Sequence, residues 1–188
     1  MIIAITGVMG SGKTTAASFF PHSWKRISAD TAGHALLEDP RIVKRLTTAF
    51  GDTIITRGKI DRVLLAKRAF FNKNTLKKLN IIMHPPLRKK ILQEIKKMKK
   101  ERRNAVLDCA LVQKLGLGTF VDCTILITAP LPLCAKRATR WSKKDITERI
   151  QVQKTLQNPD FVIANTASKN DLKKAVVKIV TLLEHSQK

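Results

Sequence analysis

The sequence predicts an α/β fold in which a five-stranded parallel sheet is flanked by helices. Segments 1–6, 105–109, 123–128 and 161–164 are short and largely apolar, as buried strands are, and the more polar segment 25–29 is a further short strand candidate. Helix-like segments separate them, and this alternation is typical of a parallel sheet that is covered on both faces. A glycine-rich loop follows the first strand directly and leads into a helix start.

Helix-capping residues support the predicted helices between these strands. Asp39 followed by Pro40 starts a helix that we expect to end before Gly51. Arg57-Gly58-Lys59 predicts a turn, and Asp61 caps a helix over 62–71. Ser168 and Asp171 form a capping box for the last helix, which we expect to run to about residue 184.

The long basic region before the third strand predicts two helices. The first covers 74–83 and is expected to break at His84-Pro85-Pro86, because proline lacks an N–H group and clashes with the preceding turn. The second covers 87–103 and carries one apolar stripe. Its nine Lys or Arg residues against two Glu indicate a solvated face, with a membrane or RNA contact as the alternative.

Residues 7–14 match the phosphate-binding pattern G-x-x-x-x-G-K-[ST]. Glycines let the backbone bring its N–H groups close to an anion, and the helix start adds unpaired N–H groups. The lysine reaches the β- and γ-phosphates of a nucleoside triphosphate, and the threonine hydroxyl binds Mg²⁺. The predicted ATP-binding residues here are Gly7, Met9, Gly10, Ser11, Gly12, Lys13, Thr14 and Thr15.

Polar residues end three of the other predicted strands, where ligands bind in open α/β sheets. Asp30 can orient an acceptor hydroxyl and take its proton, or it can cap a helix over Thr31–Leu37. Asp108 can hold the water shell of Mg²⁺, contact the substrate, or be only a polar strand end. Asn165 ends the fifth strand, and we expect it to lie near ATP.

Further candidates follow from position and charge. Lys136, Arg137 and Arg140 lie on a helix after the fourth strand, where cations can fold over the phosphates as a lid or simply be surface charge. His84 has no partners at metal-ligand spacing, so we expect a structural or substrate-contacting role for it.

Composition limits the function classes. The 188 residues suffice for one domain, and the apolar stretches are far shorter than the ~20 residues of a membrane span. Three cysteines without a C-x-x-C pair suit buried thiols in a reducing cytoplasm. The net charge of +22 favours nonspecific binding of polyanions, unless it is only a lysine-rich solvated surface.

Over nearly its whole length the chain resembles the bacterial dephospho-coenzyme A kinase family. The two most specific matches are Gly58-Lys59-Ile60-Asp61-Arg62-x-x-Leu65 and Leu79-Asn80-x-x-x-x-His84-Pro85. The other matches, in order along the chain, are the glycine loop, Ser28-Ala29-Asp30, Phe50-Gly51, Phe70, Leu107-Asp108-x-Ala110-Leu111-Val112, Lys136-x-x-x-Arg140, Arg149-Ile150-x-x-Gln153 and Asp160-x-Val162-Ile163-x-Asn165.

The resemblance implies a P-loop kinase core over about 1–38 and 104–188, a helical acceptor-binding region over about 39–103 and a lid over about 136–148. The implied reaction transfers the γ-phosphate of ATP, with Mg²⁺, to the 3′-hydroxyl of dephospho-coenzyme A. The resemblance assigns Asp30 as the base, Lys13 and Arg140 as catalytic cations, and Arg140 also to ATP. It assigns the acceptor site to Asp30, Arg62, His84, Asp108 and Leu111.

The chain departs from the family pattern at four places. Ala110 stands where the family has Pro, Lys114 where it has Glu, and Lys136 where it has Arg. The Gly that commonly follows the Asn165 position is missing. These departures bear on the acceptor contacts and on the lid geometry, and not on the kinase class. Two alternatives stay open on other grounds: a nucleoside or nucleoside monophosphate kinase with the same core, and a P-loop nucleic-acid-binding protein that uses ATP as a switch.

Overall fold

The structure is a computed structural model that describes residues 1–138 and 158–185. The chain divides into two compact units, Met1–Ser28 with Glu94–Lys188, and Ala29–Gln93. Each unit is described by itself below. Among the described residues, no helix has both the length and the apolar character that crossing a membrane requires.

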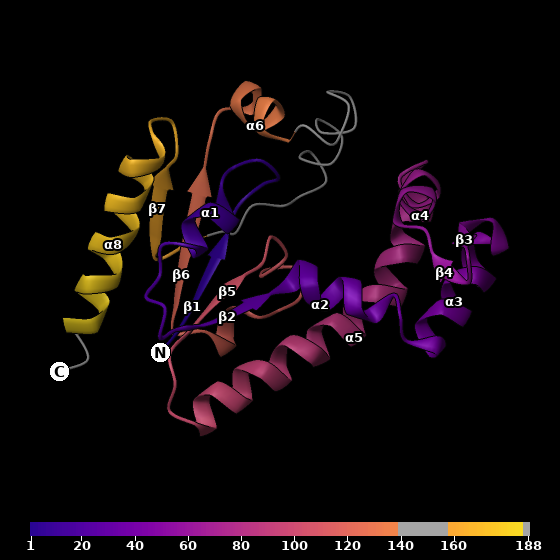
Figure 1. Cartoon of the computed structure of the whole chain (residues 1–188), viewed down its shortest axis with the longest axis horizontal. Helices are drawn as coiled ribbons and strands as arrows, with labels where there is room; N and C mark the ends of the chain where they lie inside the picture. Colours follow the sequence, from indigo (N-terminus) through magenta and orange to yellow (C-terminus); the bar gives the residue numbers. More distant parts are fainter. Residues whose placement is uncertain (139–157, 186–188) are drawn as a thin grey trace. The chain divides into compact units, whose positions relative to one another are not determined.

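The first unit is built on the predicted five-stranded parallel sheet (Figure 1). Its strands are β1 (Ile2–Thr6), β2 (Lys25–Ser28), β5 (Ala105–Asp108), β6 (Cys123–Thr128) and β7 (Phe161–Ala164), in the spatial order β2-β5-β1-β6-β7. Every neighbouring pair is parallel. The carboxyl ends of all five strands therefore meet at one edge, as the predicted fold requires.

Both faces of the central strands are buried. Ile3 and Ile5 pack in a cluster with Leu172 and Val176 of α8 (Lys169–His185), and α1 (Lys13–Ala17) contributes Ala16 to the same cluster. Ile2 and Ala4, which point to the opposite face, are also fully buried. Burial on both faces explains why these strands are almost continuously apolar. The unit also contains η2 (Gly118–Phe120) and α6 (Leu131–Arg137).

The second unit is mainly helical. It contains α2 (Ala29–Leu36), α3 (Pro40–Phe50), η1 (Asp52–Ile54), α4 (Arg62–Ala69) and the first part of α5 (Lys73–Lys100). Side chains from α3, α4 and α5 share a core, which includes Leu46, Leu65 and Ile82. The predicted Asp39 and Asp61 caps are confirmed, because each carboxylate accepts backbone N–H groups of the first turn that it precedes.

A β-hairpin in this unit was only half predicted. The turn at Arg57-Gly58 joins β3 (Ile55–Thr56) to β4 (Lys59–Ile60) in an antiparallel pair. Both turn residues have positive φ, 52° and 76°, as a tight hairpin with the right-handed strand twist needs. The strands themselves were missed because two residues are too few to show an alternating pattern.

The predicted break at His84-Pro85-Pro86 is wrong, because α5 continues through both prolines. Proline removes one helical hydrogen bond and costs about 3 kcal/mol in a helix interior. Apolar side chains on either side of the prolines, including Ile82, Leu87 and Ile91, are buried, and this burial offsets the cost. Local sequence signals therefore gave the wrong end for this helix.

Candidate active site

The glycine-rich loop lies where β1 meets α1, at the carboxyl edge of the sheet. Gly7, Gly10 and Gly12 have φ values of 144°, 77° and 101°, which side chains rarely adopt. A Cβ at Gly7 would also overlap the carbonyl oxygen of Ile127, and one at Gly10 would overlap that of Cys134. The sequence pattern therefore reflects both the backbone conformation and the close packing of the loop against β6 and α6.

The two polar residues that open α1 have partners in the same unit. The Lys13 ammonium donates to the carbonyl oxygen of Val8 at 2.9 Å, so its charge lies back over the loop. The Thr14 hydroxyl donates to Oδ2 of Asp108 at 2.7 Å. The helix begins at Lys13, so Lys13 and Thr14 lie in its first turn, where the backbone N–H groups have no partner within the helix.

Asp108 reaches Thr14 because of the strand order. β5 lies between β1 and β2, with Asp108 opposite Ile5 on one side and Ser28 on the other. The pairing of a threonine hydroxyl with a carboxylate gives two oxygen ligands of the kind that Mg²⁺ prefers. Among the described residues there is no group of three or more His, Cys, Asp or Glu that could hold a metal ion.

Asn165 supports the glycine-rich loop through a side-chain hydrogen bond. It is buried, its side-chain amide donates to the carbonyl oxygen of Ser11 at 2.8 Å, and its backbone N–H donates to that of Thr128. Arg137 donates to the carbonyl oxygen of Asn165 at 3.1 Å. Sequence reasoning found Asn165 but not this supporting role, since Ser11 and Asn165 are 154 residues apart.

The Ser11 hydroxyl and the Cys134 thiol are two further polar groups at the loop. The Ser11 hydroxyl is buried and has no hydrogen-bond partner within the described part of the chain. Burial raises the pKa of the Cys134 thiol above its ordinary value, although the charges of Arg137 and Lys13 oppose this. Cys134 therefore stays a neutral thiol at pH 7 and adds no negative charge near the phosphate site. All three cysteines are free and buried, as was predicted for Cys109 and Cys123.

Asp30 lies in the second unit, in the first turn of α2, where it is exposed. The helix begins at Ala29, so Asp30 does not cap it. A carboxylate there still interacts favourably with the helix dipole. Asp30 has no hydrogen-bond or ion-pair partner among the described residues, which leaves both of its oxygens accessible to a ligand.

One turn further along α2, His34 contacts a second predicted site residue. Arg62 NH1 lies 3.1 Å from Nδ1 and 3.0 Å from Nε2 of His34. A guanidinium can only donate, so the ring nitrogen of His34 is the acceptor in this contact, and which nitrogen accepts depends on the tautomer. Residues four apart on a helix share a face, so Asp30, His34 and Arg62 form one polar group. Sequence reasoning missed His34, although its spacing from Asp30 was a usable signal.

The remaining predicted residues are placed as follows. His84 is half-buried within α5, and Leu111 is half-buried, with its backbone N–H directed to the sulfur of Cys109. Met9 and Thr15 lie in the loop and in α1 and are half-buried. Arg140 and most of the predicted lid over 136–148 lie outside the described residues.

The second unit also contains an open groove of about 650 Å³. Its apolar lining includes Phe50 and Phe71, and Phe71 is 81% exposed. Lys67 and Arg68 line the groove as well. Arg68 also donates to the carbonyl oxygen of Phe50 at the end of α3, which fixes its guanidinium at the rim.

A glycine-rich loop of this geometry, after the central strand of a parallel sheet and with Lys13 and Thr14 at the helix start, defines a P-loop protein that binds nucleoside triphosphates. The particular family follows from comparison with known proteins. The chain belongs to the dephospho-CoA kinase family, whose model matches residues 1–171.

Individual relatives agree with this assignment. The chain is 32% identical to dephospho-CoA kinase of Dehalococcoides mccartyi, over 93% of each protein. It is 29% identical to that of Wolinella succinogenes, over 97% of this chain and 94% of the relative. Among solved structures it is similar to dephospho-CoA kinase from Campylobacter jejuni, with a TM-score of 0.71 and 25% identity over 100% of this chain and 98% of that one.

Proposed function

We propose that this protein transfers the γ-phosphoryl group of ATP to the 3′-hydroxyl of dephospho-coenzyme A, the last step of coenzyme A biosynthesis. The observation that carries the proposal is the P-loop with its Thr14–Asp108 pair, in a chain of the dephospho-CoA kinase family. The buried free thiols suit a reducing compartment, so we place this reaction in the cytoplasm.

The residues of the first unit bind and orient the nucleotide. Backbone N–H groups of the loop and of the first turn of α1 bind the phosphates, and Lys13 turns from Val8 toward the β- and γ-phosphates when ATP is present. Thr14 would bind Mg²⁺ and Asp108 would hydrogen-bond to its water shell. The ion would supply positive charge against the charge that develops on the phosphates.

The polar residues Asp30, His34 and Arg62 of the second unit bind the acceptor. Asp30 orients the 3′-hydroxyl and accepts its proton as the bond to phosphorus forms. Arg62 binds an anionic part of the acceptor, with His34 holding the guanidinium in place. His84 and Leu111 complete the predicted acceptor contacts, and Asp108 remains a second candidate contact. Arg140 and the lid keep their predicted roles in ATP binding and in stabilising the transferring phosphoryl.

The groove in the second unit suits another part of the same acceptor. Dephospho-coenzyme A carries a pyrophosphate and a long, weakly polar pantetheine arm. The Phe50 and Phe71 rings offer apolar surface to that arm, and Lys67 and Arg68 offer positive charge to phosphate groups.

An acceptor panel tests the proposal directly. The purified protein is given ATP and Mg²⁺ with dephospho-coenzyme A, nucleosides or nucleoside monophosphates, and the phosphorylated product is measured. Dephospho-coenzyme A should have the highest kcat/KM. Faster transfer to nucleosides or nucleotides would show that the protein is a nucleoside or nucleoside monophosphate kinase instead. ATP binding without transfer to any acceptor would favour a P-loop protein that uses ATP as a switch.

A further inference from the structure

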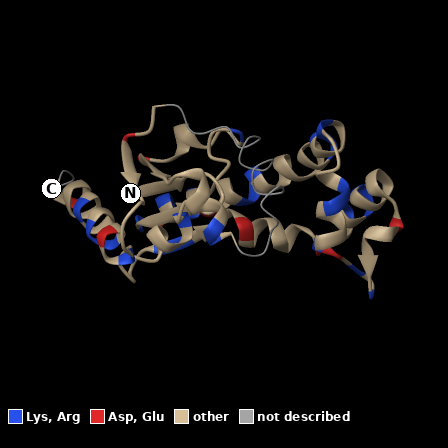
Figure 2. Ribbon diagram, turned by 90° about the horizontal axis from the view of Figure 1, so that it is seen from above, with Lys and Arg blue, Asp and Glu red and all other residues tan. Residues whose placement is uncertain are grey.

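The amino edge of the sheet, opposite the P-loop, carries a dense group of basic residues. We call it the amino-edge surface and define it as Lys25, Arg26, Lys96, Lys97, Lys100, Arg102 and Arg103. All seven side chains are exposed and all belong to the first unit. Figure 2 shows that basic residues are spread over both units, so the total charge does not by itself single out this edge.

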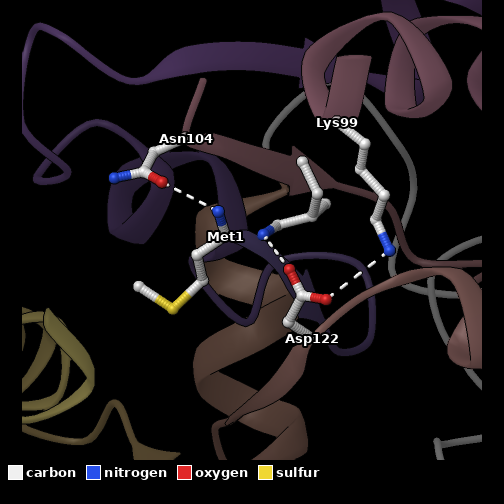
Figure 3. Close-up of polar contacts among 5 residues, drawn as sticks. Met1, Lys99, Asn104 and Asp122 are labelled. Carbon is white, nitrogen blue, oxygen red and sulfur yellow. Dashed lines mark hydrogen bonds and ion pairs between the residues drawn. The ribbon is translucent and has the colours of Figure 1, made fainter. Parts of the chain in front are cut away.

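Polar contacts join the chain segments that carry these residues, and Figure 3 shows the contacts made by Met1, Lys99, Asn104 and Asp122. The Met1 ammonium donates to Oδ1 of Asn104 at 2.8 Å, and the carbonyl oxygen of Asn104 accepts the backbone N–H of Lys25. Asp122 accepts the N–H of Ile2 through one oxygen and pairs with Lys99 through the other at 3.5 Å. The end of α5 is therefore joined to the starts of β1, β2, β5 and β6, so the segments that carry the basic residues meet at the same end of the unit.

Neighbouring acids leave most of this charge uncompensated. Glu101 is paired with Arg103, and Asp122 is paired with Lys99. Lys25, Lys96, Lys97, Lys100 and Arg102 have no ion pair within residues 1–138 and 158–185. Lysines in the last turn of α5 complement its dipole, but that explanation does not extend to the cations of β2 or of the turn after the helix.

We propose that the amino-edge surface binds the phosphodiester backbone of nucleic acid without sequence selectivity. Clustered Lys and Arg bind a polyanion chiefly by releasing its condensed counterions, and phosphate contacts carry no base information. A membrane surface fits less well, because membrane-bound faces also insert apolar side chains. The exposed large apolar residues of the described chain, such as Phe71 and Val177, all lie outside this surface.

This inference goes beyond the proposed kinase reaction and is independent of it. β1 has five residues, so its first and last Cα atoms are about 13 Å apart at ~3.3 Å per residue. The P-loop follows one end of β1, and Met1 lies at the other. ATP and nucleic acid can therefore be bound at the same time.

Two matched triple variants test the location. Lys96→Gln, Lys97→Gln and Lys100→Gln remove three charges from the amino-edge surface. Lys173→Gln, Lys174→Gln and Lys178→Gln remove three exposed charges from α8 in the same unit, as the control. Affinity for a labelled mixed-sequence duplex is measured by fluorescence anisotropy between about 50 and 200 mM salt, the range over which phosphate contacts lose affinity steeply.

The first variant should bind the duplex at least about ten times more weakly than wild type at the lowest salt. The slope of log affinity against log salt concentration should become less steep by about 3, one for each lost lysine contact. The control should change little, and phosphoryl transfer should be unchanged in both. Saturating ATP and Mg²⁺ should leave wild-type affinity for the duplex unaltered.

Three results would overturn the proposal. Equal losses in the two variants would show that only net charge matters. Displacement of the duplex by ATP would place the polyanion in the P-loop. Tighter binding to vesicles rich in anionic lipid than to nucleic acid, lost in the first variant, would make the surface a membrane contact.

Discussion

The two regions assigned to the reaction are built in different ways. In the first unit, polar groups of the P-loop are bound by residues from distant parts of the chain. The Thr14 hydroxyl donates to Asp108, and the backbone carbonyl of Ser11 accepts from buried Asn165. In the second unit, Asp30 is exposed without a partner among the described residues, and Arg62 has one contact, with exposed His34. The phosphate site is thus preorganised, whereas the acceptor residues are still open to a ligand.

This difference indicates where each region gets its specificity. A triphosphate is bound mainly by backbone N–H groups, so its site depends on a rigid loop conformation. An acceptor hydroxyl is recognised by individual side chains, whose contacts form when the ligand arrives. Substitutions in the first unit should therefore act on charge or on stability, and those in the second on acceptor chemistry.

The largest effect is expected for Lys13→Ala. We expect Lys13 to neutralise charge on the transferring group, and an arginine finger that acts on the same group is worth about 10³–10⁵ in rate. Turnover should fall by at least about 10³-fold while the circular dichroism spectrum is unchanged. Lys178→Ala on α8 serves as the control and should keep native activity. A folded Lys13→Ala protein with near-native turnover would contradict the P-loop assignment.

Asp30→Asn should follow, with a loss of about 10²–10⁴ in kcat, the usual range for a positioned general base. Asparagine keeps the size and can still hydrogen-bond, but cannot take a proton at neutral pH. Affinity for ATP, measured by calorimetry, should change little because the loop is untouched. Glu38→Gln, an exposed acid in the same unit, is the control. Native turnover of Asp30→Asn would mean that the base lies elsewhere.

Asn165→Ala tests the preorganisation of the loop. The substitution leaves the buried Ser11 carbonyl without its donor, which should lower the free energy of unfolding by about 1–3 kcal/mol. KM for ATP should rise as the loop loses its support. Urea unfolding and steady-state kinetics measure the two effects. Unchanged stability together with unchanged KM would show that the loop keeps its conformation without Asn165.

The smallest effect is expected for His34→Ala. One hydrogen bond contributes about 0.5–1.5 kcal/mol, which corresponds to a rise of about 2- to 10-fold in KM for the acceptor, with kcat unchanged. His22→Ala, an exposed histidine of the first unit, is the control. If KM for the acceptor stays at its native value, Arg62 does not need His34 for its position.

Local chemistry explains what could be predicted from the sequence. The P-loop, the five strands, the Asp39 and Asp61 caps and the Ser168–Asp171 capping box are all encoded within a few neighbouring residues. Glycines at positive φ and side chains that accept first-turn N–H groups act over one turn of chain, so the sequence determined these features, and with them the phosphate-binding chemistry.

The tertiary structure decided the features that depend on distant segments. Strand order brings Asp108 to Thr14 across 94 residues and Asn165 to Ser11 across 154. Burial along α5 keeps one helix through Pro85 and Pro86, against the local signal for a break. Such outcomes depend on which surfaces pack together and how much apolar area they bury, and no short stretch of sequence contains that information.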